Sequence, residues 1–334
     1  MIWNQQVETL SRTEMTAWQA YKLTKIIERV YEKSFLYQIR MKECGLLPEN
    51  ITNLDDLKKL PVTTKQDIAA NYPYGLLTMP VSGVAYIHKT LEAQDHFAVS
   101  YTRNDLAMWS ELMSRILVAG GVNMTSVFQW VGTAKENAPS LGVHFGIQQI
   151  GSTLLSDSRS SMLAQIHLIE DFGITSIFSA ASHLLQLAQE AGMNGYKPAE
   201  LPLQNIFCDS NLVSQSQGEK IQQIYGKKPI QVYGMYDIWG MGIAGECHCD
   251  AGLHVQEDCF YPEILHPVSG QVLPIGEIGE LVLTSLTLEA MPLLRFTTGM
   301  LCSLDDSPCA CGRTLIRIRK ETEKNDLYPC GQRW

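Results

Sequence analysis

The sequence predicts an α/β protein in which a parallel sheet is covered by helices and is followed by a smaller β-rich subdomain. From residue 100 to residue 233, helical and strand-like segments alternate, which is typical of parallel strands joined by helices. After Gly234 the pattern changes to strand-like segments joined by turns that contain Gly and Pro. We therefore expect an α/β region at 1–233, a β-rich subdomain at 234–320 and a short tail at 321–334.

The first 100 residues are predicted to be mainly helical. Apolar residues at helical spacing predict one helix over 13–45, which Gly45 closes. A short helix is expected to begin at Leu54, and Thr63 or Thr64 is expected to cap another that begins at Lys65.

The alternating region gives the order of the remaining elements. Its strands are expected at 126–130, 152–155, 175–178, 205–208 and 230–233. Its helices are expected at 101–119, 141–150, 162–172, 180–191 and 214–225. In the β-rich subdomain, strands are expected at 253–257, 263–266, 279–284 and 292–297. Strands that alternate with helices imply a parallel sheet with helices on its faces.

Composition excludes several classes of protein. The chain has 334 residues, of which 45% are hydrophobic, so it is long enough for a large core. The formal net charge is −9 and no basic stripe is visible, which argues against nucleic acid or an anionic membrane as the main partner. Residues 1–12 lack the apolar core of a signal peptide, and no apolar run approaches the roughly 20 residues of a membrane span. We expect a cytoplasmic protein.

Nine cysteines are present, and some of them are closely spaced. In a cytoplasmic protein they should be reduced, so close pairs such as Cys247 with Cys249 and Cys309 with Cys311 suggest a metal. Zn²⁺ takes four nitrogen or sulfur ligands in structural sites, and a Cys-x-Cys-Gly turn presents two thiolates to one ion. The alternative is a set of reduced, half-buried thiols.

Six segments of the chain carry a recognisable family pattern: 60–67, 71–75, 101–105, 141–146, 261–264 and 276–282. They resemble the phenylacetate–CoA ligase family of acyl-adenylate-forming enzymes. They are collinear, which makes the likeness more specific than a single motif. The resemblance implies the large N-terminal domain of the adenylate-forming fold. It also implies a reaction in which ATP activates a carboxylic acid, typically aromatic, before transfer to coenzyme A.

The likeness fails where the family binds ATP phosphates. Family members carry a Ser/Thr/Gly-rich loop there, because backbone N–H groups must surround the triphosphate. In this chain the corresponding residues run from Lys89 to His96, with no glycine and with the carboxylates of Glu92 and Asp95. The resemblance therefore makes ATP and Mg²⁺ doubtful cofactors.

Other positions of the family's nucleotide site also differ. The Gly-Ala-Glu segment that lines the adenine pocket corresponds to 208–210, which reads Cys-Asp-Ser. The magnesium-binding Glu corresponds to Asp237, which is one methylene shorter. The ribose-binding Asp corresponds to Met300, whose thioether cannot accept a charge-assisted hydrogen bond. By the resemblance, the family's lid domain and its lysine would lie beyond Trp334, so we expect this chain to lack them.

Part of the family's pocket is retained. By the resemblance, the floor of the acyl pocket is formed by Tyr233, Gly234 and Met235. Arg295 holds a family position near the nucleotide pocket, with a structural ion pair to Glu280 or another acid as the alternative. His144 lies on the central helix and is a weak catalytic candidate, since a lone His on an apolar helix is more often a core residue.

A subset of the family shares the cysteine pattern. By the resemblance, the ligands of a structural zinc are Cys247, His254, Cys309 and Cys311. Cys249 is the alternative to His254, and His248 is a weaker candidate.

The departures together predict a degenerate ligase that no longer adenylates. It would handle an acyl or aryl group without ATP, for example by transferring the group from a preformed thioester such as an acyl-CoA or acyl carrier. The alternatives are an active ATP-dependent aryl– or acyl–CoA ligase and a non-catalytic partner of an active ligase. Members of the family often pair, so a homodimer is also an expectation.

Overall fold

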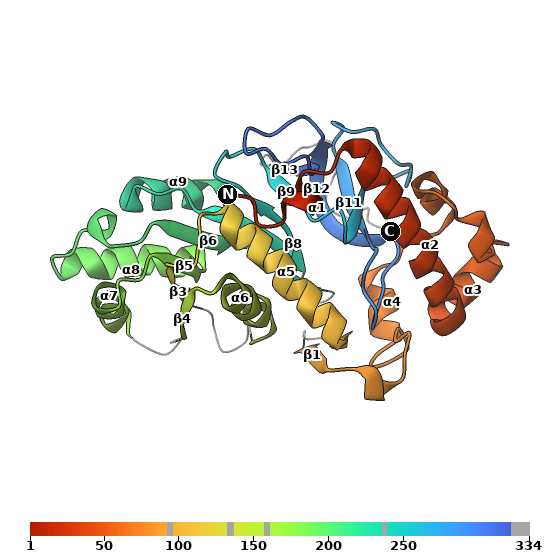
Figure 1. Ribbon diagram of the computed structural model, residues 1–334, viewed down its shortest axis with the longest axis horizontal. Coiled ribbons are helices and arrows are strands. Elements are labelled where there is room, and N and C mark those ends of the chain that lie inside the picture. Colours follow the sequence, from red (N-terminus) through yellow and green to blue (C-terminus); the bar gives the residue numbers. More distant parts are fainter. Residues whose placement is uncertain (92–95, 132–136, 157–160, 236–238, 322–334) are drawn as a thin grey trace. The chain divides into compact units, whose positions relative to one another are not determined.

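A computed structural model describes residues 1–91, 96–131, 137–156, 161–235 and 239–321 of the chain (Figure 1). The chain forms two compact units. The first unit comprises Met1–Asn4 and Met108–Leu253, and the second comprises Gln5–Ala107 and His254–Trp334. This division differs from the regions predicted from sequence style, because the N-terminal helices pack with the C-terminal strands.

The first unit contains the predicted parallel sheet. Strands β3 (Val127–Val131), β4 (Thr153–Ser156), β5 (Ser176–Ser179), β6 (Asn205–Asp209) and β7 (Ile230–Met235) pair in parallel in the order β4-β3-β5-β6-β7. Strand β8 (Gly240–Glu246) pairs antiparallel with β7 and was not predicted. The five predicted strands are confirmed with ends that shift by one or two residues.

Helices cover the sheet of the first unit, as the alternating pattern predicts. They are α5 (Arg103–Ala119), α6 (Asn137–Ile150), α7 (Met162–Asp171), α8 (Ala181–Met193) and α9 (Gln215–Tyr225). Ile166 and Ile169 of α7 and Leu184 of α8 form one buried cluster with Ile177 of β5 and Ile206 of β6. Because these parallel strands are buried, they are almost continuously apolar in sequence.

Helices α5 and α6 approach each other closely at two glycines. A Cβ added to Gly142 would lie 2.2 Å from Nε1 of Trp109, and one added to Gly146 would lie 2.8 Å from Cβ of Met113. The same Trp109 donates a hydrogen bond to the carbonyl of Met241 on β8, at 2.6 Å. This packing fixes α6, which carries His144, against its neighbours.

The second unit begins with α1 (Gln5–Glu8), α2 (Arg12–Lys33), α3 (Phe35–Glu43) and α4 (Lys65–Ala70). The single helix predicted over 13–45 is wrong, because Ser34 is extended (φ −105°, ψ 116°) and separates α2 from α3. The short helix expected at Leu54 is a 3-10 helix over Leu54–Lys59, and Thr64, one of the two predicted residues, caps α4. No helix that the structure describes is long and apolar enough to cross a membrane.

The N-terminal helices share a core with distant residues. Leu23, Ile27 and Val30 of α2 form a buried cluster with Leu286 and Leu294. Removing these aliphatic side chains from water stabilises the unit, since burial of each contributes about 1.5–3 kcal/mol. Residues more than 250 positions apart therefore belong to one compact unit.

The strands of the second unit are β9 (Leu253–Val255), β10 (Phe260–Leu265), β11 (Gly279–Ser285), β12 (Phe296–Asp305) and β13 (Arg317–Lys320), in the order β10-β11-β12-β13-β9. The strand predicted at 292–297 begins only at Phe296. Arg295 has φ 47°, a left-handed conformation that cannot continue a strand. The unit also contains an antiparallel hairpin of β1 (Tyr86–Leu91) and β2 (His96–Tyr101), which was not predicted.

Candidate functional site

The predicted acyl- and adenine-pocket residues of the first unit meet at one edge of its sheet. Strands β6 and β7 are parallel, so Asp209 and Tyr233 lie at the same, carboxyl-terminal edge, where α/β sheets usually bind ligands. Asn211 joins the two strand ends: its backbone N–H donates to Oδ1 of Asp209 (2.7 Å), and its side-chain amide donates to the carbonyl of Gly234 (2.8 Å). Asp237, the predicted magnesium ligand, lies outside the described residues.

Gly234 is required by the backbone at this edge. A Cβ at Gly234 would lie 2.2 Å from the carbonyl oxygen of Gly240, so β7 and β8 could not pair with any larger residue there. The pairing also shifts register between Tyr233 and Gly234. Tyr233 is almost completely buried, whereas Met235 is half-buried. Of the predicted pocket floor, Met235 is thus the more accessible side chain.

His144, the weak catalytic candidate, is half-buried on α6. Burial lowers the pKa of its imidazole from the ordinary value of 6.5. Its Nε2 atom is buried and has no hydrogen-bond partner among the described residues. The ring is therefore neutral at pH 7 and retains an unused nitrogen.

Arg295 is held inside the second unit. Its Nε donates to Oε2 of Glu263 at 3.1 Å, and its Nη1 donates to the carbonyl of Leu60 at 2.6 Å. Burial raises the pKa of Glu263, and the charge of Arg295 opposes that shift. Of the two interpretations of Arg295, this arrangement matches the structural ion pair, with Glu263 as the acid. Glu280 instead accepts a hydrogen bond from the backbone N–H of Gly299, at 3.0 Å.

The hairpin β1–β2 occupies the place where the family's phosphate loop was expected. Its ladder runs without interruption from the Tyr86–Tyr101 pair to the Leu91–His96 pair. Residues 92–95, which connect the paired strands, lie outside the described residues. Met300, at the expected ribose position, is half-buried on β12, and its backbone N–H donates to Oγ1 of Thr298 at 3.2 Å.

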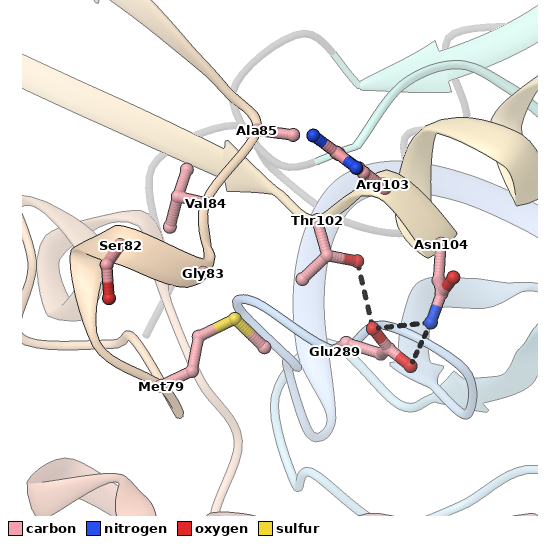
Figure 2. Close-up of a pocket in the computed structure, with 9 residues that line it drawn as sticks. All are labelled: Met79, Ser82, Gly83, Val84, Ala85, Thr102, Arg103, Asn104 and Glu289. Carbon is pink, nitrogen blue, oxygen red and sulfur yellow. Dashed lines mark hydrogen bonds between the residues drawn. The ribbon is translucent and has the colours of Figure 1, made fainter.

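A pocket of about 640 Å³ opens beside this hairpin, within the second unit (Figure 2). It is lined by Met79, Ser82, Gly83, Val84, Ala85, Thr102, Arg103, Asn104 and Glu289. The carboxylate of Glu289 accepts hydrogen bonds from Oγ1 of Thr102 (2.9 Å) and from Nδ2 of Asn104 (3.0 Å). The Glu289 carboxylate is thus hydrogen-bonded to two side chains at the N-terminus of α5. Sequence reasoning missed this pocket, because its wall joins residues 187 positions apart.

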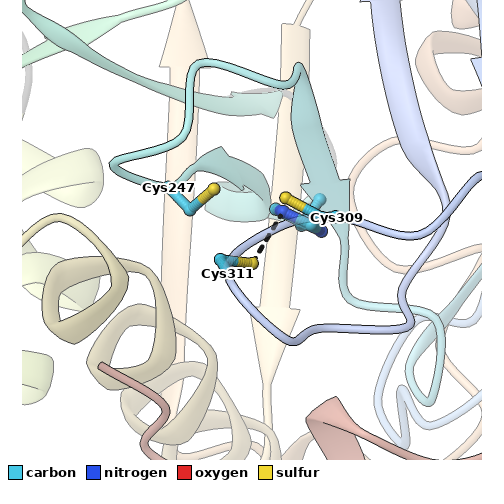
Figure 3. A group of neighbouring side chains, drawn as sticks. Cys247, Cys309 and Cys311 are labelled. Atoms are coloured by element: carbon cyan, nitrogen blue, oxygen red, sulfur yellow. Dashed lines mark hydrogen bonds between the residues drawn. The ribbon is translucent and has the colours of Figure 1, made fainter.

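The predicted metal ligands come together (Figure 3). One ligand atom each from Cys247, His254, Cys309 and Cys311 lies within 4.8 Å of the others. Cys247, His254 and Cys309 are buried, and Cys311 is half-buried. Sulfur and imidazole nitrogen are the donors that Zn²⁺ prefers, so the donor set fits that ion.

Neighbouring groups orient these side chains. Nδ1 of His254 faces the carbonyl oxygen of Leu315 at 3.4 Å, which directs Nε2 toward the sulfur of Cys311 at 3.6 Å. A carbonyl on the second nitrogen is the usual companion of a metal-binding histidine. Cys249, the alternative ligand, lies outside the cluster and instead donates its backbone N–H to the sulfur of Cys247 at 3.4 Å.

The relatives found by comparison with known proteins share one enzyme name. The chain is 33% identical over 320 residues to phenylacetate–coenzyme A ligase of Thermus thermophilus, covering 95% of this chain and 72% of the relative. It is 34% identical over 323 residues to the enzyme of the same name from Pseudomonas putida, covering 96% and 73%. For the Escherichia coli enzyme the identity is 31% over 316 residues, with coverage of 93% and 72%. A search against models of protein families found no match.

Solved structures agree on the fold. A 2-hydroxyisobutyryl-CoA ligase in an open conformation, in complex with 2-HIB-AMP and CoA, superposes with a TM-score of 0.87 at 19% identity, over 95% of this chain and 76% of the other. Apo MatB from Rhodopseudomonas palustris superposes with a TM-score of 0.55 at 14% identity, over 72% and 49%. The chain therefore has the fold of the acyl-adenylate-forming ligases and belongs to the phenylacetate–coenzyme A ligase family.

Proposed function

We propose that this chain handles an acyl or aryl group, bound as a preformed thioester, without ATP-dependent adenylation. The observation that carries the proposal is the β1–β2 hairpin. Pairing up to Leu91 and His96 engages the backbone of both strands and leaves residues 92–95 as the connection. That connection contains no glycine and two carboxylates, Glu92 and Asp95. Phosphate-binding loops need free N–H groups and no opposing negative charge.

The ribose position supports the same proposal. Family members use a carboxylate there, which grips the two ribose hydroxyls. Met300 offers a thioether, which accepts hydrogen bonds only weakly. Charge-assisted hydrogen bonds are roughly twice as strong as neutral ones, so the loss of this carboxylate weakens the binding of any nucleotide.

Acyl transfer from a thioester needs a pocket that orients the activated carbonyl toward an acceptor. The retained Tyr233, Gly234 and Met235 are the residues we propose for the acyl-pocket floor. His144 stays the weak candidate for proton transfer: its imidazole is neutral, but its Nε2 atom is buried and would have to become accessible to meet a substrate. We assign no nucleophile on the chain. The thiol of an acceptor, coenzyme A or an acyl carrier, would lose its proton and attack the thioester carbonyl, and the donor thiolate would leave and take up a proton.

Nucleotide titration tests this proposal directly. ATP with Mg²⁺, and separately AMP, would be titrated calorimetrically into the full chain, with the Escherichia coli relative as the positive control. We expect no heat up to millimolar nucleotide, and turnover of aryl- or acyl-CoA thioesters in its place. Micromolar ATP binding with carboxylate-dependent release of pyrophosphate would overturn the proposal.

The second candidate function is that of an ordinary ATP-dependent aryl–CoA ligase. The names of the curated relatives at 31–34% identity favour it. A Met300→Asp variant separates the two candidates. If the pocket is otherwise intact, restoring the carboxylate should raise AMP affinity at least tenfold. In an ordinary ligase that already binds nucleotide through other groups, the same change should have little effect.

We further propose that Cys247, His254, Cys309 and Cys311 hold a structural Zn²⁺. Four protein donors close the coordination shell, so the ion would stabilise the fold and would leave no position for substrate. Elemental analysis of the purified chain is expected to give about one zinc per molecule. Cys309→Ser should lose it, while Cys249→Ser and the exposed Cys44→Ser should retain it. Loss of zinc in Cys249→Ser would instead make Cys249 the ligand in place of His254.

Two expectations about this chain stay predictions. They are its cytoplasmic location and its assembly as a homodimer. Gel filtration with light scattering would measure the second. A third alternative, a non-catalytic partner of an active ligase, would follow if the chain neither binds nucleotide nor turns over thioesters.

A further inference from the structure

The N-terminal segment 5–12 contacts the loop that carries two of the proposed metal ligands, Cys309 and Cys311. The backbone N–H of Thr314 donates to the carbonyl of Glu8 at 3.1 Å. The hydroxyl of the same Thr314 donates to the carbonyl of Leu10 at 2.6 Å. Thr314 is three residues after Cys311, so these contacts fix the end of the Cys-x-Cys turn.

A buried ion pair reinforces the contact. Nε of Arg313 donates to Oε2 of Glu8, and the two side chains are only 2% and 1% exposed. Arg313 is the second residue after Cys311, so the buried pair lies beside one of the proposed metal ligands. Glu8 is therefore linked to a proposed metal ligand through one intermediate residue.

A second ion pair holds the other side of the loop. Arg12 binds Glu257 with both guanidinium Nη atoms, at 3.1 and 2.8 Å. Oε2 of Glu257 also accepts the backbone N–H of Ile316 at 2.6 Å. Ile316 follows Leu315, whose carbonyl faces Nδ1 of His254. The N-terminal segment thus restrains both the Cys311 side and the His254 side of the cluster.

The charges are consistent with this arrangement. Three thiolates around one Zn²⁺ leave one negative charge in a largely buried place. The guanidinium of Arg313 supplies the opposite charge beside Cys311, and Glu8 fixes the position of that guanidinium. Partners of this kind hold metal ligands in orientation, and their loss typically weakens metal binding 10- to 100-fold.

We propose that Glu8, acting through Arg313, is a positioning residue for the Cys/His site, so that the N-terminal segment sets how tightly the site holds its metal ion. The inference rests on the proposed structural zinc. It adds that residues 5–12, which contain no metal ligand, belong to the site.

Competition with a chromophoric chelator tests it on the full chain. Zinc affinity would be measured for the wild type, for Glu8→Gln and for the control Glu32→Gln, whose side chain is 66% exposed. We expect Glu8→Gln to bind zinc roughly 10- to 100-fold more weakly and the control to match the wild type. In the double variant Glu8→Gln/Arg313→Gln, the two effects should be less than additive, since both act through one link.

Cobalt provides a readout that a general loss of stability would not change. Co²⁺ bound by thiolates absorbs through sulfur-to-metal charge transfer, and the band responds to hydrogen bonds on sulfur. Glu8→Gln and Arg313→Lys should shift this band, whereas Arg319→Lys, a control on an exposed ion pair with Asp305, should not. If Glu8→Gln does not fold, Arg313→Lys against Arg319→Lys gives the same comparison.

The outcomes separate the two proposals. A wild-type chain that binds neither Zn²⁺ nor Co²⁺ would remove the metal site and this inference with it. A wild-type chain that binds both, with Glu8→Gln and Arg313→Lys indistinguishable from their controls, would leave the metal site intact and overturn the inference.

Discussion

Two regions of this protein treat buried polar side chains in opposite ways. Around the cysteine loop of the second unit, buried carboxylates are paired: Glu8 with the buried Arg313, and Glu257 with the partly exposed Arg12. Removing one partner from such a pair would leave an uncompensated charge in the interior, which is strongly unfavourable. The geometry of this region is therefore fixed by the protein's own groups.

The sheet of the first unit contrasts with that loop. Gln129 on β3 is completely buried, and neither end of its amide has a partner among the described residues. Nε2 of His144 on α6 is in the same condition. An unsatisfied buried polar group costs about 1–3 kcal/mol, so such groups are expected to meet water or a ligand. The comparison teaches that the two buried carboxylates near the loop are held by cationic partners, whereas the Gln129 amide and Nε2 of His144 are not held by any group that the structure describes.

The largest expected effect would break the paired side of the comparison. Glu8→Ala leaves Arg313 buried without its carboxylate, so we expect the free energy of unfolding to fall by about 3–5 kcal/mol. Urea denaturation of the zinc-replete chain measures it. Glu32→Ala, on an exposed pair with Lys33, should stay within about 0.5 kcal/mol of the wild type. A similarly small loss for Glu8→Ala would show that the pair is not buried in solution.

A smaller effect tests whether α6 is held rigidly, so that His144 cannot move to find a partner. Gly142→Ala would place a Cβ 2.2 Å from Nε1 of Trp109, and we expect it to cost about 1–3 kcal/mol of unfolding free energy. Gly192 is the matched control, since an added Cβ there meets nothing within 4 Å in helix α8. Gly192→Ala should stabilise by about 0.4–1 kcal/mol. Equal effects of the two variants in thermal denaturation would contradict the close packing.

The pH dependence of stability sharpens the account of His144. Burial lowers the pKa of His144 below 6.5, so the unfolded chain binds a proton that the folded chain does not. Stability from this group is present above pH 6.5 and is lost as the pH falls through the folded-state pKa. His144→Asn should therefore reduce the slope of unfolding free energy below pH 6.5, by up to about 1.4 kcal/mol per pH unit. Burial also lowers the pKa of His183, so part of the pH dependence of unfolding free energy should remain in both the wild type and the variant. An unchanged slope in His144→Asn would mean that the imidazole is solvated.

The smallest expected change concerns Gln129. Replacing an unpartnered buried amide by an apolar group of similar size is nearly neutral or stabilising. Gln129→Leu should accordingly change the unfolding free energy by less than about 1 kcal/mol. A loss of about 2 kcal/mol or more in urea denaturation would show that the amide does bond to something in solution. The contrast between the two regions would then disappear.

Much of the fold could be predicted because its signals are local. Apolar strands separated by helical segments indicate a parallel sheet, and β3 to β7 pair in parallel as expected. Errors arose where one residue carries the signal. Ser34 is extended in the middle of a helical pattern, and Arg295 adopts a positive φ inside an apolar run. In both cases tertiary contacts decide a conformation that the neighbouring residues do not.

The candidate site divides in the same way. The four metal-ligand candidates could be found from their spacing and the family resemblance, and they lie within 4.8 Å of one another. The clamp of Glu8 on Arg313 could not be found, because a carboxylate in a short N-terminal helix carries no sign of a partner 305 residues away. The Glu289 wall of the pocket was missed for the same reason.

The sequence by itself determined the α/β class, the order of helices and strands along the chain, and the family. It also determined which residue types are available for a metal and for an acyl group. These follow from periodicity and from motifs, which are properties of neighbouring residues. Only the tertiary structure decided which charges are buried together and which polar groups have no partner in the part of the chain that it describes. Burial and pairing depend on segments that are distant in sequence, and the free energy of a charge depends on what surrounds it in space.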